Sequence, residues 1–116
     1  MIYRFTIFKP FEDYISYSPN MEYPYEFLNQ IGGSHWTSLK AQEHIKDIED
    51  VLNDIKPVEY IGDYSGDILN LHIYKEFTEV SSPIEFEEIP EGMKIPTIEI
   101  LKLMEDFRDF LISQGV

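Results

Sequence analysis

Two segments of the sequence repeat apolar residues at the three- and four-residue spacing of an amphipathic helix. The first covers about residues 37 to 55, and its apolar positions are Leu39, Ala41, Ile45, Ile48, Leu52 and Ile55. The second covers residues 97 to 113, and its predicted inward positions are Ile98, Leu101, Met104, Phe107 and Leu111. Each helix buries one apolar face, so the rest of the chain has to supply a surface that covers both.

Residues at the ends of both segments agree with these limits. Thr37 or Ser38 can cap the start of the first helix, and Pro57 ends it. Thr97 is predicted to be the N-cap of the second helix. Gly115 stands where a glycine commonly closes a helix.

Alternating apolar and polar residues predict strands elsewhere. Residues 1–8 indicate a well-covered strand, and residues 58–64 and 68–77 indicate a hairpin whose turn contains Gly66. Residues 84–88 indicate a third antiparallel strand at a sheet edge. This order predicts a single α+β domain over residues 1–116, in which an antiparallel sheet of about four strands carries the two main helices on one face.

Residues 10–27 contain six aromatic rings and four carboxylates but no Lys or Arg. The prolines in this stretch leave room for at most a short extended piece at residues 14–18 and a helical turn at residues 25–30. Burial statistics favour core positions for Phe11 and Phe27. The four tyrosines are left open between core and surface, and they are Tyr14, Tyr17, Tyr23 and Tyr25.

The charge of the chain restricts its partners. Twenty-two acidic residues against nine basic ones give a net charge of −13, which repels nucleic acids and anionic membranes and predicts a basic protein partner. The sequence has no cysteine, no apolar run long enough for a membrane span and no signal-peptide pattern at its start. These features predict a cytoplasmic protein.

No motif specifies a reaction or a cofactor. His35, His44 and His72 fit no metal-ligand spacing, and Gly32-Gly33 lacks the spacing and the lysine of a phosphate-binding loop. Trp36 is expected to fill one end of the core. We therefore expect no enzymatic activity, no cofactor and no bound metal.

The remaining candidate is a surface of tyrosines and carboxylates. Tyrosine rings bury much area at low entropic cost, and carboxylates engage Lys and Arg of a partner. The predicted partner-binding residues are Tyr14, Tyr17, Glu22, Tyr23, Tyr25 and Glu26, with Asp47, Asp50 and Asp54 on the exposed side of the first helix.

The last quarter of the chain resembles the end of small bacterial immunity proteins, which neutralise polymorphic or contact-dependent toxins. The residues that carry this resemblance are Pro96, Thr97, Ile100, Leu101, Phe107, Phe110 and Leu111. The resemblance implies an inhibitor of a cognate toxin, often a nuclease with a basic substrate cleft. The matched residues are packing residues, so they bring no binding site with them.

Two other classes of function remain open. Regularly spaced carboxylates on the folded surface would favour a phosphate mimic that inhibits a host DNA-binding protein. A deep pocket lined by His35, Trp36 or His72 would favour a small enzyme or ligand-binding domain.

Overall fold

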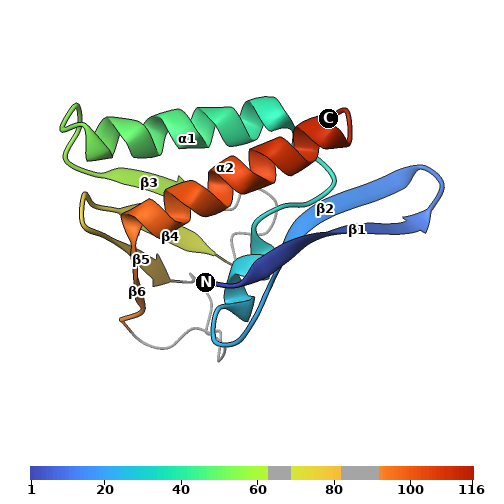
Figure 1. The fold of residues 1–116 in the computed structure, drawn as a ribbon, viewed down its shortest axis with the longest axis horizontal. Coiled ribbons are helices and arrows are strands. Elements are labelled where there is room, and N and C mark those ends of the chain that lie inside the picture. The colour runs from blue at the N-terminus through green and yellow to red at the C-terminus, as the bar shows by residue number, and fades with distance from the viewer. Residues whose placement is uncertain (63–68, 82–91) are drawn as a thin grey trace.

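The computed structural model describes residues 1–62, 69–81 and 92–116 (Figure 1). The elements in chain order are β1 (Tyr3–Phe11), β2 (Tyr14–Met21), the 3-10 helix η1 (Glu26–Gln30), α1 (Ser38–Leu52), β3 (Glu59–Gly62), β4 (Asn70–Ile73), β5 (Phe77–Ser81), β6 (Lys94–Pro96) and α2 (Thr97–Ser113). The predicted α+β class is confirmed. The predicted turn at residues 65–67 and the predicted strand at residues 84–88 lie outside the described residues.

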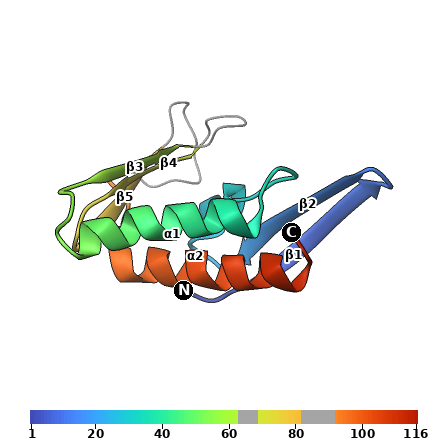
Figure 2. The same cartoon turned by 90° about the horizontal axis from the view of Figure 1, so that it is seen from above.

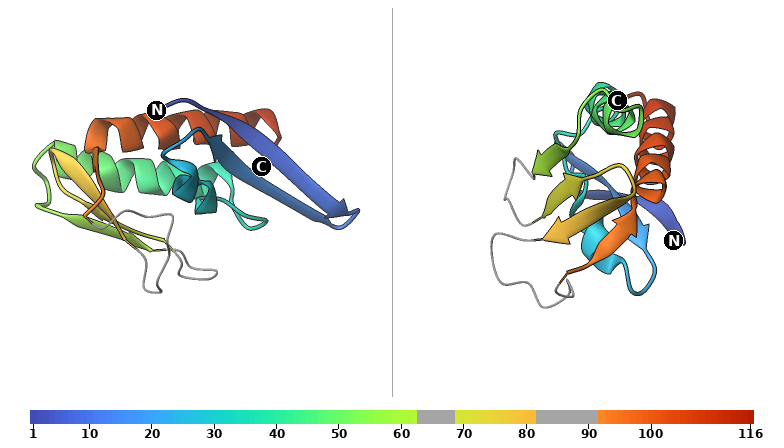
Figure 3. Two further views of the ribbon diagram at one scale, coloured as in Figure 1. Left: turned by 90° about the horizontal axis from the view of Figure 1, so that it is seen from below. Right: turned by 90° about the vertical axis from the view of Figure 1, so that its left-hand side faces the viewer.

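Four antiparallel strands form the larger sheet, in the order β3-β4-β5-β6. Opposed residues share a face, and the row Ile61, Leu71 and Val80 is buried. Both long helices lie on one side of this sheet (Figure 3). The inward side chains of the sheet and the helices belong to one apolar cluster.

Both predicted long helices are present, with corrections to their detail. The hydroxyl of Thr37 accepts a hydrogen bond from the Lys40 N–H at 3.1 Å, as expected of an N-cap. Thr97 is instead the first residue of α2; its buried hydroxyl lies 2.9 Å from that of Thr78 and donates to the carbonyl of Tyr74. The prediction for Ile98 is wrong, because its side chain is 68% exposed. The buried positions of α2 are Thr97, Ile100, Leu103, Met104, Phe107 and Leu111.

Residues 68–77 do not form one strand. The chain reverses after β4, and the Tyr74 N–H donates to the Phe77 carbonyl at 3.0 Å. The turn rests on the start of α2, since the Thr97 N–H also reaches the Glu76 carbonyl at 3.4 Å. A contact distant in sequence therefore holds this turn, which contains no Gly or Pro.

The aromatic segment is more extended than its prolines suggested. β2 pairs with β1 over most of its eight residues and includes Pro19, opposite Phe5. A proline is tolerated at the edge of a sheet, where its missing N–H removes no ladder hydrogen bond. The two strands form a second sheet, an arm that extends beyond the helices (Figures 1 and 2).

β2 packs against the core along most of its length, whereas β1 does so only near its start. The Phe5 ring lies 5.5 Å from the ring of Phe107 and 5.2 Å from that of Phe110, both on α2. Tyr17 is 7% exposed and contacts Phe110 edge to face at 6.1 Å. β1 was predicted to be well covered, but every residue from Ile7 to Phe11 is exposed. The outer half of β1 therefore has no core beneath it, whereas Ile15 of β2 is partly buried against the core.

Candidate interaction surface

A bulge controls which side chains share a face at the end of the arm. Phe8 lies opposite Ser16 and Phe11 lies opposite Tyr14, so the register shifts by one residue between these pairs. Side chains alternate along a strand, which puts Tyr14 on the face of Ser16 and therefore of Phe8. The extra residue in β1 turns Phe11 onto the same face. Without the bulge, Phe8 and Phe11 would point to opposite faces.

Phe8, Phe11 and Tyr14 therefore form one group, which we name the aromatic tip. Their exposed fractions are 62%, 73% and 42%. Glu12 and Asp13 form the turn between the two strands, and both are exposed. The expectation that Phe11 is a core residue is wrong, whereas Phe27, at 1% exposure, is in the core as expected.

The predicted tyrosines are distributed over different environments. Tyr14 belongs to the aromatic tip, whereas Tyr17 is part of the core. Tyr23 is 88% exposed in the loop that follows β2, and Tyr25 is half-buried against the core. Segment 10–27 is thus partly surface and partly core.

Two exposed acids flank Tyr23 at the root end of the arm: Glu22 in this loop and Glu26 at the first position of η1. Tyr14 is the first residue of the eight-residue strand β2, and the loop follows its last residue. At roughly 3.3 Å per residue, the two places lie about 25 Å apart. The structure does not bring the residues predicted in this segment into one patch.

The predicted acids of α1 engage lysines of the same chain. Asp47 and Asp50 lie 3.5 Å and 4.0 Å from the ammonium group of Lys56, and Asp50 also lies 3.5 Å from that of Lys46. The Glu59 carboxylate, 2.6 Å away, raises the pKa of Lys56. Much of the negative charge on this side of α1 is therefore balanced locally.

Asp54 closes α1 in an unusual backbone conformation. Its φ is 60°, in the left-handed region where glycine is usual. The N–H of Ile55 reaches the Asp50 carbonyl at 2.8 Å and that of Asp54 reaches the Val51 carbonyl at 3.2 Å, the paired bonds of a Schellman motif. Its carboxylate lies 2.7 Å from the ammonium group of Lys75.

Trp36 and the three histidines lie in different environments. Trp36 is 8% exposed and fills part of the core as expected, next to the buried ring of His44 at 5.4 Å. Burial, followed by the positive charge of Lys40, lowers the pKa of His44; the carboxylates of Asp47, Glu43 and Glu59 oppose this more weakly. His35 is exposed in the loop before α1.

His72 lies on the outer face of the larger sheet, in the row Tyr60, His72, Glu79 and Lys94 that crosses all four strands. Its ring lies 5.1 Å from that of Tyr60. In the described ranges, no three His, Asp or Glu side chains are placed to hold a metal ion.

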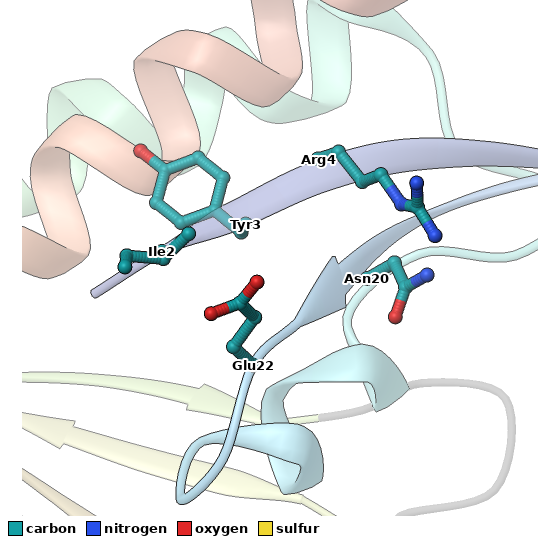
Figure 4. Close-up of a pocket in the computed structure, with 5 residues that line it drawn as sticks. All are labelled: Ile2, Tyr3, Arg4, Asn20 and Glu22. Carbon is teal, nitrogen blue, oxygen red and sulfur yellow. The ribbon is translucent and has the colours of Figure 1, made fainter.

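Two shallow hollows flank the start of β1. One, of about 270 Å³, is lined by Ile2, Tyr3, Arg4, Asn20 and Glu22 (Figure 4). The Tyr3 ring points from it towards α2, where its hydroxyl donates to Asp106. Burial, and then this carboxylate, raises the pKa of Tyr3. The second hollow, of about 330 Å³, lies between Tyr3 and Ile98. Tyr3 thus has a structural role in holding β1 on α2.

Sequence reasoning missed the aromatic tip as a unit. Its three members are separated by Pro10, which suggests a break, and neither strand indicates the bulge that aligns them. A usable signal was present in β1, where Ile7 and Phe8 are adjacent apolar residues, so a strand covered on only one face must expose one of them.

No helix in the described ranges is long and apolar enough to cross a membrane. No protein-family model matches the chain, and no curated protein or solved structure shows significant similarity to it. An inference about function therefore depends on the surface of this molecule itself.

Proposed function

We propose that this protein is a cytoplasmic, non-enzymatic inhibitor that neutralises a basic protein partner, namely a toxin nuclease domain whose substrate surface it occludes. The observation that carries the proposal is the arm, which exposes Phe8, Phe11 and Tyr14 on one face next to Glu12 and Asp13. Aromatic anchors beside carboxylates are a common composition for binding a cationic surface.

The net charge supports the same class of partner. A charge of −13 attracts a basic protein over distances beyond contact, and such steering accelerates association about ten- to a thousandfold at low salt. The arm also carries Arg4 and Lys9, so the long-range attraction comes from the molecule as a whole. The resemblance of the last helix to that of bacterial immunity proteins fits this role.

A phosphate mimic is less well supported. Such a protein presents rows of free carboxylates, whereas Asp47 and Asp50 of α1, and Asp54 just after it, pair with lysines. The inhibitor of a toxin is therefore the function that we adopt.

The test is co-expression with a panel of basic nuclease domains from bacterial toxins, scored by rescue of growth and by measured association rates. We expect rescue for a cognate domain, with association that slows as salt is added because charge is screened. Rescue by no member of the panel, or association indifferent to salt, would argue against this function.

Two charge reversals locate the contact. Glu12→Lys with Asp13→Lys alters the arm turn, and Glu22→Lys with Glu26→Lys alters the loop at its root; each pair raises the net charge by four. We expect the arm pair to slow association about tenfold at low salt and the loop pair to slow it less. An equal effect would show that only total charge matters, and a larger effect of the loop pair would place the contact near Tyr23.

A further inference from the structure

The aromatic tip exposes an apolar patch of substantial area to solvent. Taking about 200 Å² for a fully exposed aromatic side chain, its three rings leave roughly 350 Å² open to solvent. That lies within the range of about 300–600 Å² for the largest patch on a typical monomer, which is often functional. A two-stranded hairpin is marginal by itself in water, so a covered arm is also a more stable one.

A second copy of this chain is a poor occupant of the tip. An interface of standard size buries about 800 Å² on each partner, more than twice what the three rings offer, so any protein partner also contacts residues around them. Two copies would also bring together net charges of −13 each. The charge favours a different protein, with apolar walls to receive the rings and cations to meet the turn.

We infer that the aromatic tip is the anchor of the interface: Phe8, Phe11 and Tyr14 insert into an apolar groove of a protein partner whose rim carries Lys or Arg side chains facing Glu12 and Asp13. The cationic character of the partner rests on the proposed function. The inference adds that the rings determine the rate of dissociation of the complex, whereas the carboxylates determine its rate of association.

The geometry makes the rings suitable for this role. They lie on one face of a ribbon about as wide as two strands, so a groove can enclose them without meeting the helices. Truncation of a buried aromatic anchor typically costs about 2 kcal/mol or more, equal to roughly thirtyfold in affinity. Because the rings are exposed in the free protein, their removal should leave its fold intact.

The experiment uses a synthetic amphipathic peptide of leucine and lysine as the probe and a peptide of serine and lysine with equal charge as its control. Amide chemical shifts of the ¹⁵N-labelled protein are followed during titration at about 0.15 M salt, where exposed charges are largely screened. We expect the leucine peptide to shift amides in residues 7–16, and the serine peptide to cause no comparable change there. Equal shifts with both peptides, or shifts centred on α1, would overturn the inference.

Matched variants test the anchor itself. Phe11→Ser and Tyr14→Ser should each lower the affinity for the leucine peptide about tenfold or more. Ile112→Ser removes an apolar side chain that is 58% exposed on α2, and it should change affinity less than about twofold. A similar loss in all three variants would refute a localised anchor. Unchanged thermal unfolding shows that each variant is folded.

Two further results separate this inference from the proposed function and from self-association. Peptide binding at the tip without rescue from any nuclease would retain the anchor and reject the toxin role. Dimers in sedimentation velocity that disappear in Phe11→Ser would assign the tip to a second copy and overturn the inference.

Discussion

Replacement of Gly32 by alanine should destabilise this protein far more than the loss of one glycine usually does. Gly32 has a φ of +120°, and a Cβ atom there would lie 2.3 Å from the Tyr17 carbonyl oxygen and 2.9 Å from the Ser18 Cα. Both neighbours are backbone atoms of β2, so neither can move without moving the strand. The substitution therefore disrupts the contact between the arm and the loop that leads to α1.

The magnitude follows from two contributions. A non-glycine residue in such a conformation costs about 1–3 kcal/mol. Displacing β2 also threatens the bridge to Gly33, which consists of two backbone hydrogen bonds with Tyr17 of 2.9 Å and 3.3 Å, each worth about 1 kcal/mol net. The expected loss is about 3–5 kcal/mol, a large part of the roughly 5–15 kcal/mol that stabilises a domain.

The assay is urea unfolding followed by the fluorescence of Trp36, the single tryptophan, which is buried in the core. Gly115→Ala is the matched control, because Gly115 also has a positive φ, of +77°, but a Cβ atom there would meet nothing within 4 Å. The control should lose about 1 kcal/mol, the conformational cost alone. A loss in Gly32→Ala no larger than in Gly115→Ala would refute the steric reasoning.

Two further predictions concern α1. Asp54→Gly should raise the free energy of unfolding, measured in urea, by about 0.5–1 kcal/mol. Glycine suits the left-handed conformation of this position, and the change removes an acid at the negative end of the helix dipole. The exposed ion pair with Lys75 contributes little, so a lower stability of the variant would show that this pair dominates. Burial lowers the pKa of His44, so the stability that its neutral form provides is complete above the unfolded pKa of about 6.5 and is lost as pH falls through the folded pKa. Between about pH 7.5 and 5.5, His44→Leu should therefore lose less stability than the unchanged protein, and parallel pH curves would contradict this.

The sequence was sufficient to predict the two long helices, because their signals are local. Periodic apolar residues and the Thr37 cap depend on neighbours within one or two turns. The strands of the larger sheet were harder to predict from the sequence. Nothing within residues 68–77 marks the turn after Tyr74, which depends on Thr97, more than twenty positions away.

The sequence predicted which types of residue the candidate surface contains, but it did not predict which of these residues lie together. The segment from Pro10 to Phe27 does contain exposed aromatic and acidic residues, but strand pairing decides which of them lie together. Pairing buries Tyr17 against Phe110 and puts Phe8, absent from the predicted set, on the face of Tyr14, and the bulge brings Phe11 onto the same face. Long-range register of this kind leaves no trace in local composition.

The joint at Gly32 and Gly33 also determines how the arm behaves mechanically. The bridge from Gly33 holds β2 at Tyr17, so the part of the arm beyond this joint extends about 10 Å to Tyr14, taking roughly 3.3 Å for each of three residues. A tilt of about ten degrees at this joint would carry the end of the arm through about 2 Å. Small adjustments at the two glycines would thus move the three rings together, which lets one tip fit grooves that differ slightly in depth.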